Sequence, residues 1–163
     1  MDLKWDGLVV GSSSSLDSQR ANYYDNNEST YGWDGYRCGL LYNGVARDYL
    51  NNNRSTLCSG WHVPTPTEWD TLISTVNSRF SCSQQVSWSQ NWTGNNYMGL
   101  GFIPSGQRYQ SDSSFHDIGN GNSFFSTAGY AYFMSMLPYG DSIHKESSMS
   151  YKSQYSLRLI KDT

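Results

Sequence analysis

The segment 58–69 constrains the fold more than any other part of the sequence, because it leads from a loop into a capped helix. Thr65 is a suitable N-cap residue, and Pro66 follows at the first helical position, where its missing N–H is tolerated. Glu68, three residues after Thr65, completes a capping box. Apolar residues then recur at helical spacing: Trp69, Leu72, Ile73 and Val76. This pattern predicts a helix over about 66–79 with one buried face.

The rest of the chain shows short apolar runs between long stretches rich in Ser, Asn, Tyr and Gly. We expect an opening strand in 3–11, a short first helix in about 43–50 and an ordered long loop over 17–36. Residues 81–128 are expected to be mostly irregular. Further strands are expected in the ranges 99–103, 122–126, 130–137 and 153–160. With 163 residues the chain should form a single domain, 1–163, of the α+β class, with two helices, short antiparallel strands and long ordered loops.

The composition of the chain argues against two classes of partner, nucleic acids and membranes. Only 15% of the residues are charged and the net charge is −3, with no cluster of Lys or Arg, which argues against a nucleic-acid interface. No apolar run approaches the roughly 20 residues that a membrane span needs. The first residues lead into no apolar core of a signal peptide, so neither a leader nor membrane insertion is expected. The excess of Ser, Asn, Tyr and Gly fits either a loop-rich fold or a recognition surface.

Cysteine and serine patterns give no sign of catalysis. The three cysteines, Cys38, Cys58 and Cys82, allow at most one internal disulfide and form no Cys-x-x-Cys motif. We interpret them as small buried apolar residues, although a bridge such as Cys38–Cys58 would suit an exported protein. The sequence holds no Gly-x-Ser-x-Gly elbow. It therefore predicts neither a catalytic residue nor a hydrolytic triad.

A family resemblance adds to this interpretation. The residues Gly-Trp-His-Val-Pro-Thr followed by Glu-Trp, within 60–69, resemble the hallmark of the Fibrobacter succinogenes major paralogous domain. That domain is a bacterial and phage relative of the formylglycine-generating-enzyme type of C-type lectin-like fold. Six further segments resemble the family's motifs in the same order: 39–43, 105–108, 113–119, 122–127, 130–132 and 155–162. The resemblance covers roughly 36–163, implies a C-type lectin-like fold, and is weaker over 1–35.

The catalytic relatives of this family do not match the sequence. Formylglycine generation needs two neighbouring cysteines near the C-terminal end to bind copper and supply a thiolate. No cysteine follows Cys82. The iron-dependent relatives need a histidine triad, and His62 lies within the structural hallmark, where we expect a packed, hydrogen-bonded side chain. The Glu-Pro-Asn and Gln-Pro-Asp motifs of calcium-dependent lectins do not occur. We therefore expect no enzyme, no metal and no cofactor.

The resemblance also implies a variable surface. Members of the family are frequent targets of diversity-generating retroelements, which mutate adenines in a C-terminal stretch. Within 105–160, framework residues alternate here with residues that differ from the family pattern. Tyr and Phe would give such a surface contact area, and Ser and Asn adaptable hydrogen bonds. The candidate ligand-binding residues are Tyr109, Gln110, His116, Asp117, Ser123, Tyr130, Phe133, Ser135, Tyr139, Asp141, Ile143 and His144.

The sequence thus predicts a non-catalytic ligand-binding protein. We expect the variable receptor-binding or adhesin domain of a phage virion or bacterial surface, outside the cell, with a protein or cell-surface ligand. Oligomeric display would compensate for weak single-site affinity. One alternative is a glycan-binding module of a secreted bacterial protein that uses Trp88, Trp92 and Tyr97 for stacking. Another is a structural domain without a site.

Overall fold

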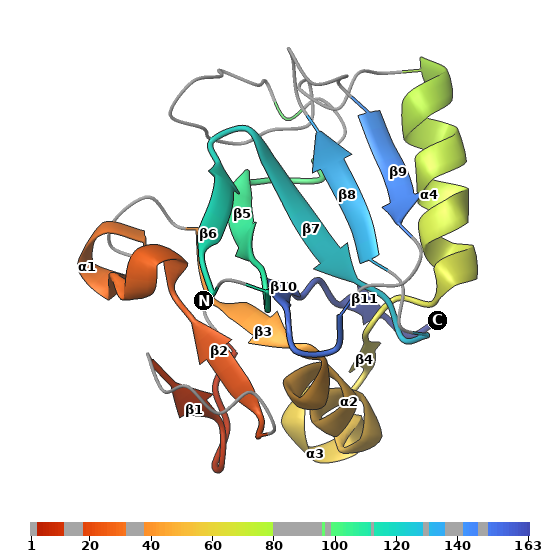
Figure 1. The fold of residues 1–163 in the computed structure, drawn as a ribbon. Coiled ribbons are helices and arrows are strands. Elements are labelled where there is room, and N and C mark those ends of the chain that lie inside the picture. The colour runs from red at the N-terminus through yellow and green to blue at the C-terminus, as the bar shows by residue number, and fades with distance from the viewer. Residues whose placement is uncertain are drawn as a thin grey trace.

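The central feature of the fold is a mixed sheet of nine strands (Figure 1). The computed structural model describes residues 3–11, 18–31, 38–79, 96, 99–111, 113–128, 131–135, 142–146 and 150–163, with the backbone alone at 77, 79 and 133–135. The nine strands are β1 (Val9–Val10), β2 (Arg20–Asn22), β3 (Leu41–Asn43), β5 (Ser105–Arg108), β6 (Phe115–Ile118), β7 (Gly121–Phe125), β8 (Ala131–Ser135), β9 (Ser142–Glu146) and β10 (Gln154–Ser156).

The order of the strands brings distant parts of the chain together. The order is β1-β2-β3-β10-β5-β7-β8-β9, and β6 pairs with β5 beside this path. The pairs β1–β2, β5–β7 and β10–β7 are parallel, and the others are antiparallel. A separate two-stranded ribbon joins β4 (Trp61–His62) to β11 (Ile160–Lys161). The late strand β10 therefore lies at the middle of the sheet, between β3 and β5.

The described residues form four α-helices: α1 (Glu28–Tyr31), α2 (Gly44–Asn52), α3 (Arg54–Leu57) and α4 (Pro66–Arg79), and one 3₁₀ turn, η1 (Tyr24–Asn26). The predicted helix over 66–79 is confirmed as α4. Its capping box is formed: the Glu68 N–H donates to Thr65 Oγ1 at 3.3 Å, and the Thr65 N–H donates to Glu68 Oε2 at 2.8 Å. The helix expected over about 43–50 is α2, capped by Asn43, whose Oδ1 accepts a hydrogen bond from the Ala46 N–H at 2.9 Å. Within the described residues, no helix has the length and apolar character that a membrane crossing requires.

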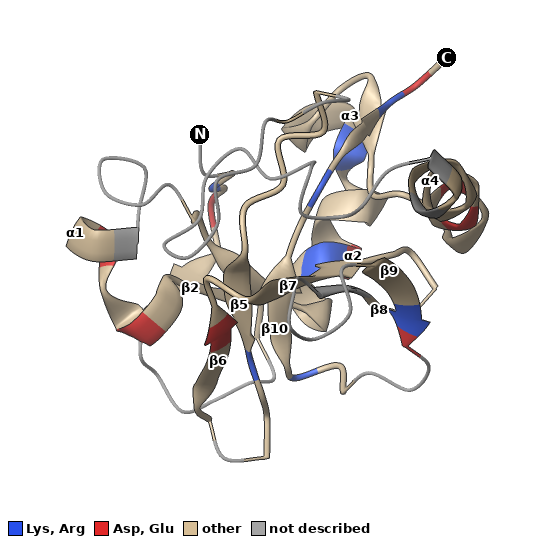
Figure 2. Ribbon diagram, turned by 90° about the horizontal axis from the view of Figure 1, so that it is seen from above, with Lys and Arg blue, Asp and Glu red and all other residues tan. Residues whose placement is uncertain are grey.

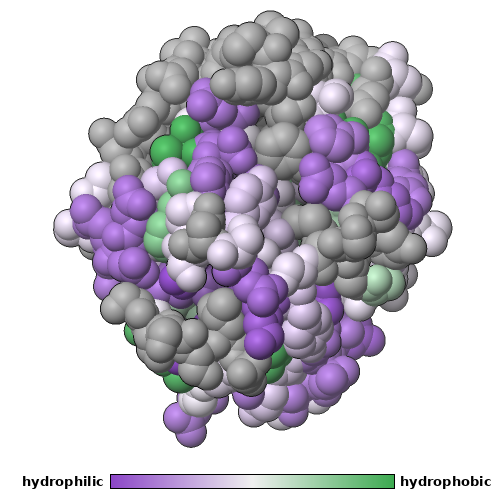
Figure 3. Space-filling model, viewed as in Figure 1, coloured by the Kyte–Doolittle hydropathy of each residue, from purple (hydrophilic) through white to green (hydrophobic). Residues whose placement is uncertain are grey.

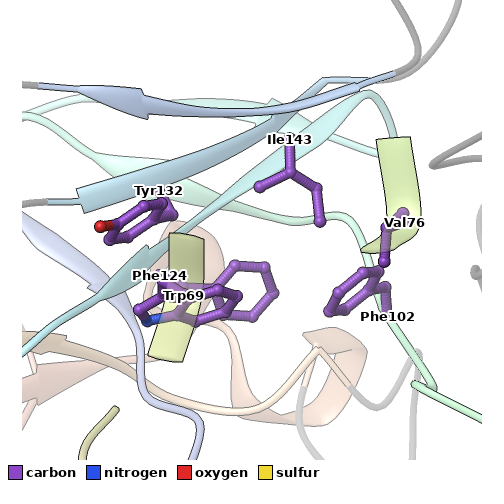
Figure 4. Close-up of a cluster of buried hydrophobic side chains, with 6 residues drawn as sticks. All are labelled: Trp69, Val76, Phe102, Phe124, Tyr132 and Ile143. Carbon is purple, nitrogen blue, oxygen red and sulfur yellow. The ribbon is translucent and has the colours of Figure 1, made fainter. Parts of the chain in front are cut away.

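The largest apolar core lies between α4 and the β7–β9 part of the sheet (Figure 4). Its buried members are Trp69, Val76, Phe102, Phe124, Tyr132 and Ile143. The ring of Trp69 lies 5.4 Å from that of Phe124 and 5.2 Å from that of Tyr132, measured between centroids. Its indole N–H donates to the Phe125 carbonyl at 3.2 Å, so this buried polar atom is satisfied. These contacts fix α4 on one face of the sheet.

The middle of the sheet is buried but polar. All residues of β2, β5 and β10 are buried, although most of them are polar or charged. Buried polar groups need hydrogen-bond partners, and side chains on other strands supply several of them here. Gln154 Nε2 donates to Asn22 Oδ1 at 2.8 Å, and the Ser105 and Ser156 hydroxyls lie 2.9 Å apart. A hydrogen-bonded polar layer therefore holds the central strands together.

The expected fold class, α+β with two helices, short antiparallel strands and long ordered loops, is wrong, and so is the C-type lectin-like plan. The described chain is dominated by the mixed nine-stranded sheet, and two of its four α-helices are only four residues long. The predicted loop over 17–36 contains β2, η1 and α1. Residues 99–103 form no strand of the sheet, and 153–160 is divided between β10 and β11. The strands β5 and β6 arise in a stretch expected to be irregular. No sequence pattern indicated β5, because a polar buried strand lacks the apolar alternation that marks a strand in sequence.

Candidate ligand-binding face

The Gln107 side chain joins three strands at one point. Gln107 is 3% exposed and lies on β5. Its Oε1 accepts a hydrogen bond from the Ser123 hydroxyl on β7 at 2.6 Å. Its Nε2 donates to Asp117 Oδ2 on β6 at 2.7 Å and to the Tyr109 hydroxyl at 2.7 Å. We call Gln107, Tyr109, His116, Asp117 and Ser123 the Gln107 cluster.

Tyr109 is the exposed member of the cluster that offers an aromatic ring. Its side chain is 37% exposed, while its hydroxyl is held by Gln107. Its ring lies 4.7 Å from the His116 ring between centroids, at an angle of 33°. The His116 Nε2 is in turn in contact with the Ser114 hydroxyl. An exposed aromatic ring is therefore fixed at its hydroxyl and on one face, which reduces the entropy that a ligand contact would cost.

Asp117 reaches Gln107 because of its backbone conformation. Successive residues of a regular strand point to opposite faces, so His116 and Asp117 would be separated by the sheet. Asp117 has φ +65°, in the left-handed region that non-glycine residues seldom adopt. Gly106, which lies between the paired residues on β5, has φ +70°, and a Cβ there would come within 2.4 Å of the His116 carbonyl oxygen. Backbone strain of this kind concentrates at functional sites.

Two further predicted residues lie at the edges of this face. Gln110 is exposed; its N–H donates to the Ser153 hydroxyl at 3.1 Å, and its Oε1 contacts the Ser150 hydroxyl. His144 is exposed on β9, with its Nε2 3.7 Å from Glu146 Oε1. The backbone register places Ser123, Phe133 and His144 in one row across β7, β8 and β9, and Ser135 opposite Gly121 and Ser142. Residues in one row share a face of the sheet, so His144 lies on the face of the Gln107 cluster.

The structure corrects part of the predicted set. Ile143 is 1% exposed and belongs to the core against α4, so a ligand does not reach it in this structure. Ser123 is 0% exposed, and its hydroxyl supports Gln107 from below the surface. Several predicted residues lie outside the described residues: Tyr130, Tyr139 and Asp141, and the stacking candidates Trp88, Trp92 and Tyr97. Gln107 was not among the residues predicted from the sequence, because it lies in a segment that resembles the family framework. No sequence pattern distinguishes a buried glutamine that links strands from any other glutamine.

The described contacts of the cluster differ from those of a Ser-His-Asp triad. The Ser114 hydroxyl contacts His116 Nε2, but the Asp117 carboxylate is hydrogen-bonded to Gln107 instead of orienting the imidazole. Among the described residues, no group of three or more His, Cys, Asp or Glu is placed to hold a metal ion. Cys38 and Cys58 are thiols, so the bridge considered from the sequence is not formed. The arrangement is suited to contact with a ligand, with polar groups beside a fixed ring.

A second aromatic surface lies over α2. Tyr49 and Tyr151 are 37% and 46% exposed. The Tyr151 hydroxyl contacts the Asp48 carboxylate, which also pairs with Arg47 at 2.7 Å. The ring of Tyr49 stacks on Trp5 with 6.2 Å between centroids. We call Trp5, Arg47, Asp48, Tyr49 and Tyr151 the α2 aromatic surface.

Charged and apolar side chains are dispersed over the rest of the described surface. Figure 2 shows Lys and Arg scattered among the described helices and strands, without a basic stripe. In the view of Figure 3, the described hydrophobic residues form small separate patches among hydrophilic ones. Among the described residues, the exposed large apolar side chains are Val9, Val10, Tyr49, Trp61, Tyr109, Tyr151 and Ile160. Of these, Tyr109 is the one that belongs to the Gln107 cluster.

Comparison of the chain with protein-family models, with curated proteins and with solved structures gives no match. The family resemblance seen in the sequence therefore stays a prediction. The geometry of the Gln107 cluster is the main support for a function.

Proposed function

We propose that this chain is a non-catalytic ligand-binding protein whose binding face is centred on the Gln107 cluster. The observation that carries the proposal is the way Gln107 fixes Tyr109. One buried amide holds the hydroxyl of a ring that is 37% exposed, and the same amide ties down Asp117 and Ser123. Tyrosine is enriched among the few residues that carry most of the binding energy at protein interfaces, where its ring gives contact area at low entropic cost.

The face combines a fixed base with replaceable side chains. Gln107 and Ser123 are buried and mutually hydrogen-bonded, so a change at either would disturb the sheet. Tyr109, Gln110 and His144 are exposed and can change with little effect on packing. A rigid base under exchangeable side chains is what a diversified recognition surface requires. This division supports the proposal that a diversity-generating retroelement varies the exposed positions.

The proposed partner is a protein or another ligand on a cell surface. This protein would be displayed on a phage virion or a bacterial surface when it binds that ligand. The described face is small, and its polar groups would be only partly desolvated on contact, so single-site affinity would be modest. Display of several copies on one particle or cell would raise the apparent affinity without any new contact. This arrangement would place the protein outside the cell.

Sequencing the encoding locus in its native genome, with its neighbourhood, tests the diversification. We expect a reverse transcriptase gene and a near-identical repeat of the 3′ end of the gene, differing at template adenines. The differing codons should include those of Tyr109, Gln110 and His144, and should leave Gln107 and Ser123 unchanged. A locus without such a repeat would remove the variable-surface proposal. Differing codons concentrated at buried positions would contradict the proposed face.

Glycan binding is the second candidate, and the α2 aromatic surface favours it. Tyr49 and Tyr151 are both exposed, and the Tyr151 hydroxyl contacts the Asp48 carboxylate. Sugar rings stack on exposed aromatic faces while their hydroxyls bond to nearby carboxylates. A glycan array probed with Tyr49→Ala, Tyr151→Ala and Tyr109→Ala decides between the faces. Loss of a glycan signal in the first two variants alone would support this second function.

A further inference from the structure

A cavity of about 210 Å³ opens between α4 and the end of the chain. Its lining is mostly apolar and includes Trp69, Leu72 and Leu100, with Glu68 and Arg158 as the charged residues. Trp69 packs on Phe124, whose neighbour Ser123 belongs to the Gln107 cluster. Because neighbouring residues of a strand point to opposite faces, the cavity lies on the other face of the sheet. It is independent of the proposed binding face.

Arg158 is the unusual residue of this lining. Its Nη2 donates to the Leu100 carbonyl, and its guanidinium lies 5.0 Å from the centre of the Phe102 ring. Arg47 and Arg54 have carboxylate partners at 2.7 and 3.1 Å, whereas no carboxylate among the described residues pairs with Arg158. Burial lowers the pKa of Arg158, although the group stays charged at neutral pH. A half-buried guanidinium without a carboxylate partner among the described residues therefore borders an apolar cavity.

The other charged residue of the lining is already engaged. Glu68 Oε2 accepts from the Thr65 N–H and from the Thr65 hydroxyl, both at 2.8 Å. Its Oε1 lies 3.0 Å from His62 Nε2. These contacts offset the charge of Glu68 and hold it at the start of α4. Of the two charged residues in this lining, Arg158 is therefore the one without an oppositely charged partner among the described residues.

We propose that the cavity binds a small carboxylic acid with an apolar body, whose carboxylate pairs with Arg158 while the body packs against Trp69, Leu72 and Leu100. The planar guanidinium fits a carboxylate through two parallel hydrogen bonds. The apolar walls favour a ring or a branched chain over a compact inorganic anion, which would leave them empty. The acid is either a free small molecule or the carboxyl-terminal residue of a peptide, which share this chemistry.

Titrations followed by NMR at the Trp69 indole N–H test the proposal, with the signal assigned from a Trp69→Phe variant. The probes are benzoate, benzyl alcohol, which keeps the ring without the charge, and acetate, which keeps the charge without the ring. We expect benzoate to bind about tenfold more tightly than either of the other two. Equal binding of benzoate and benzyl alcohol, or no binding of benzoate, would overturn the proposal. N-acetyl-phenylalanine binding more tightly than benzoate would assign the peptide terminus, and weaker binding the free acid.

Two variants locate the site. Arg158→Gln should weaken benzoate binding about tenfold, whereas Arg54→Gln, which removes an exposed arginine with a carboxylate partner, should leave it unchanged. Benzoate binding that survives Arg158→Gln would refute the pairing. If Arg158→Gln loses its near-ultraviolet circular dichroism, Leu72→Phe takes its place, because it fills the cavity and keeps the arginine. Undiminished benzoate binding by a folded Leu72→Phe variant would also refute the site.

Discussion

Replacing Gln107 by alanine tests the structural basis of the binding face. The substitution removes three hydrogen bonds, one of them to the Asp117 carboxylate. A bond to a charged group contributes about 1.5–3 kcal/mol and a neutral one about 0.5–1.5 kcal/mol. The bonds to Asp117 and Tyr109 fall at the low end, because both residues reach solvent. The Ser123 hydroxyl, 0% exposed, would be left buried without its acceptor. We expect a loss of about 3 kcal/mol in the free energy of unfolding.

Urea unfolding followed by tryptophan fluorescence measures this loss. Gln110→Ala is the matched control, because it removes an exposed glutamine three residues away and should change stability by less than about 0.5 kcal/mol. Gln107→Glu keeps the size of the side chain but sets two carboxylates against each other, so its stability should recover as the pH falls towards about 4. A Gln107→Ala variant as stable as Gln110→Ala would refute the linking role of Gln107.

Two further substitutions test local features. Burial alone would lower the pKa of His62. The hydrogen bonds and negative charges of Asp162 and Glu68 raise it by more than burial lowers it, so the pKa lies above the ordinary value. The resulting stabilisation, about 1 kcal/mol or less, is complete below about pH 6.5 and is lost as the pH rises through the raised pKa. Between pH 6 and 9 the stability of the native protein should therefore fall more than that of His62→Gln, and parallel curves would contradict the assignment. Gly106→Ala forces a side chain into φ +70° and against the His116 carbonyl, so urea unfolding should show a loss of at least about 2 kcal/mol; an unchanged midpoint would refute that reading.

The sequence predicted α4 well because its signals are local. The N-cap Thr65, the proline after it and the capping glutamate lie within four residues, and the apolar stripe that follows has helical period. The helix expected over about 43–50 corresponds to α2, which begins one residue later and ends two residues later. Such features need no information about which distant segments meet.

The strands expected in 122–126, 130–137 and 153–160 correspond to β7, β8 and β10, whereas β2 and β5 were not predicted, because polar side chains from distant positions hold this part of the sheet together. Gln154 pairs with Asn22 and Ser105 with Ser156, at sequence separations of 132 and 51 residues. The strands β2 and β5, which are buried through such pairs, show no alternation of apolar and polar residues. Propensity therefore favours a loop there, although the tertiary contacts make a strand.

Residue patterns named some members of the candidate site and also placed one buried residue in it. Tyr109, His116 and Asp117 were named from the sequence and lie together in the structure. Ile143 and His144 were both named, yet consecutive residues of a regular strand face opposite ways, and Ile143 is the one turned to the core. Asp117 escapes this rule through its positive φ, which no sequence pattern indicated.

Binding to intact bacterial cells tests the proposed face most directly. Labelled, streptavidin-tetramerised protein would be measured on a panel of cells by flow cytometry, with Tyr109→Ala and Tyr49→Ala as a matched pair, since each removes a tyrosine that is 37% exposed. We expect Tyr109→Ala to lose at least about tenfold in apparent affinity and Tyr49→Ala to stay within about twofold of the native protein. Retained binding by Tyr109→Ala, with or without loss in Tyr49→Ala, would contradict a binding face centred on the Gln107 cluster.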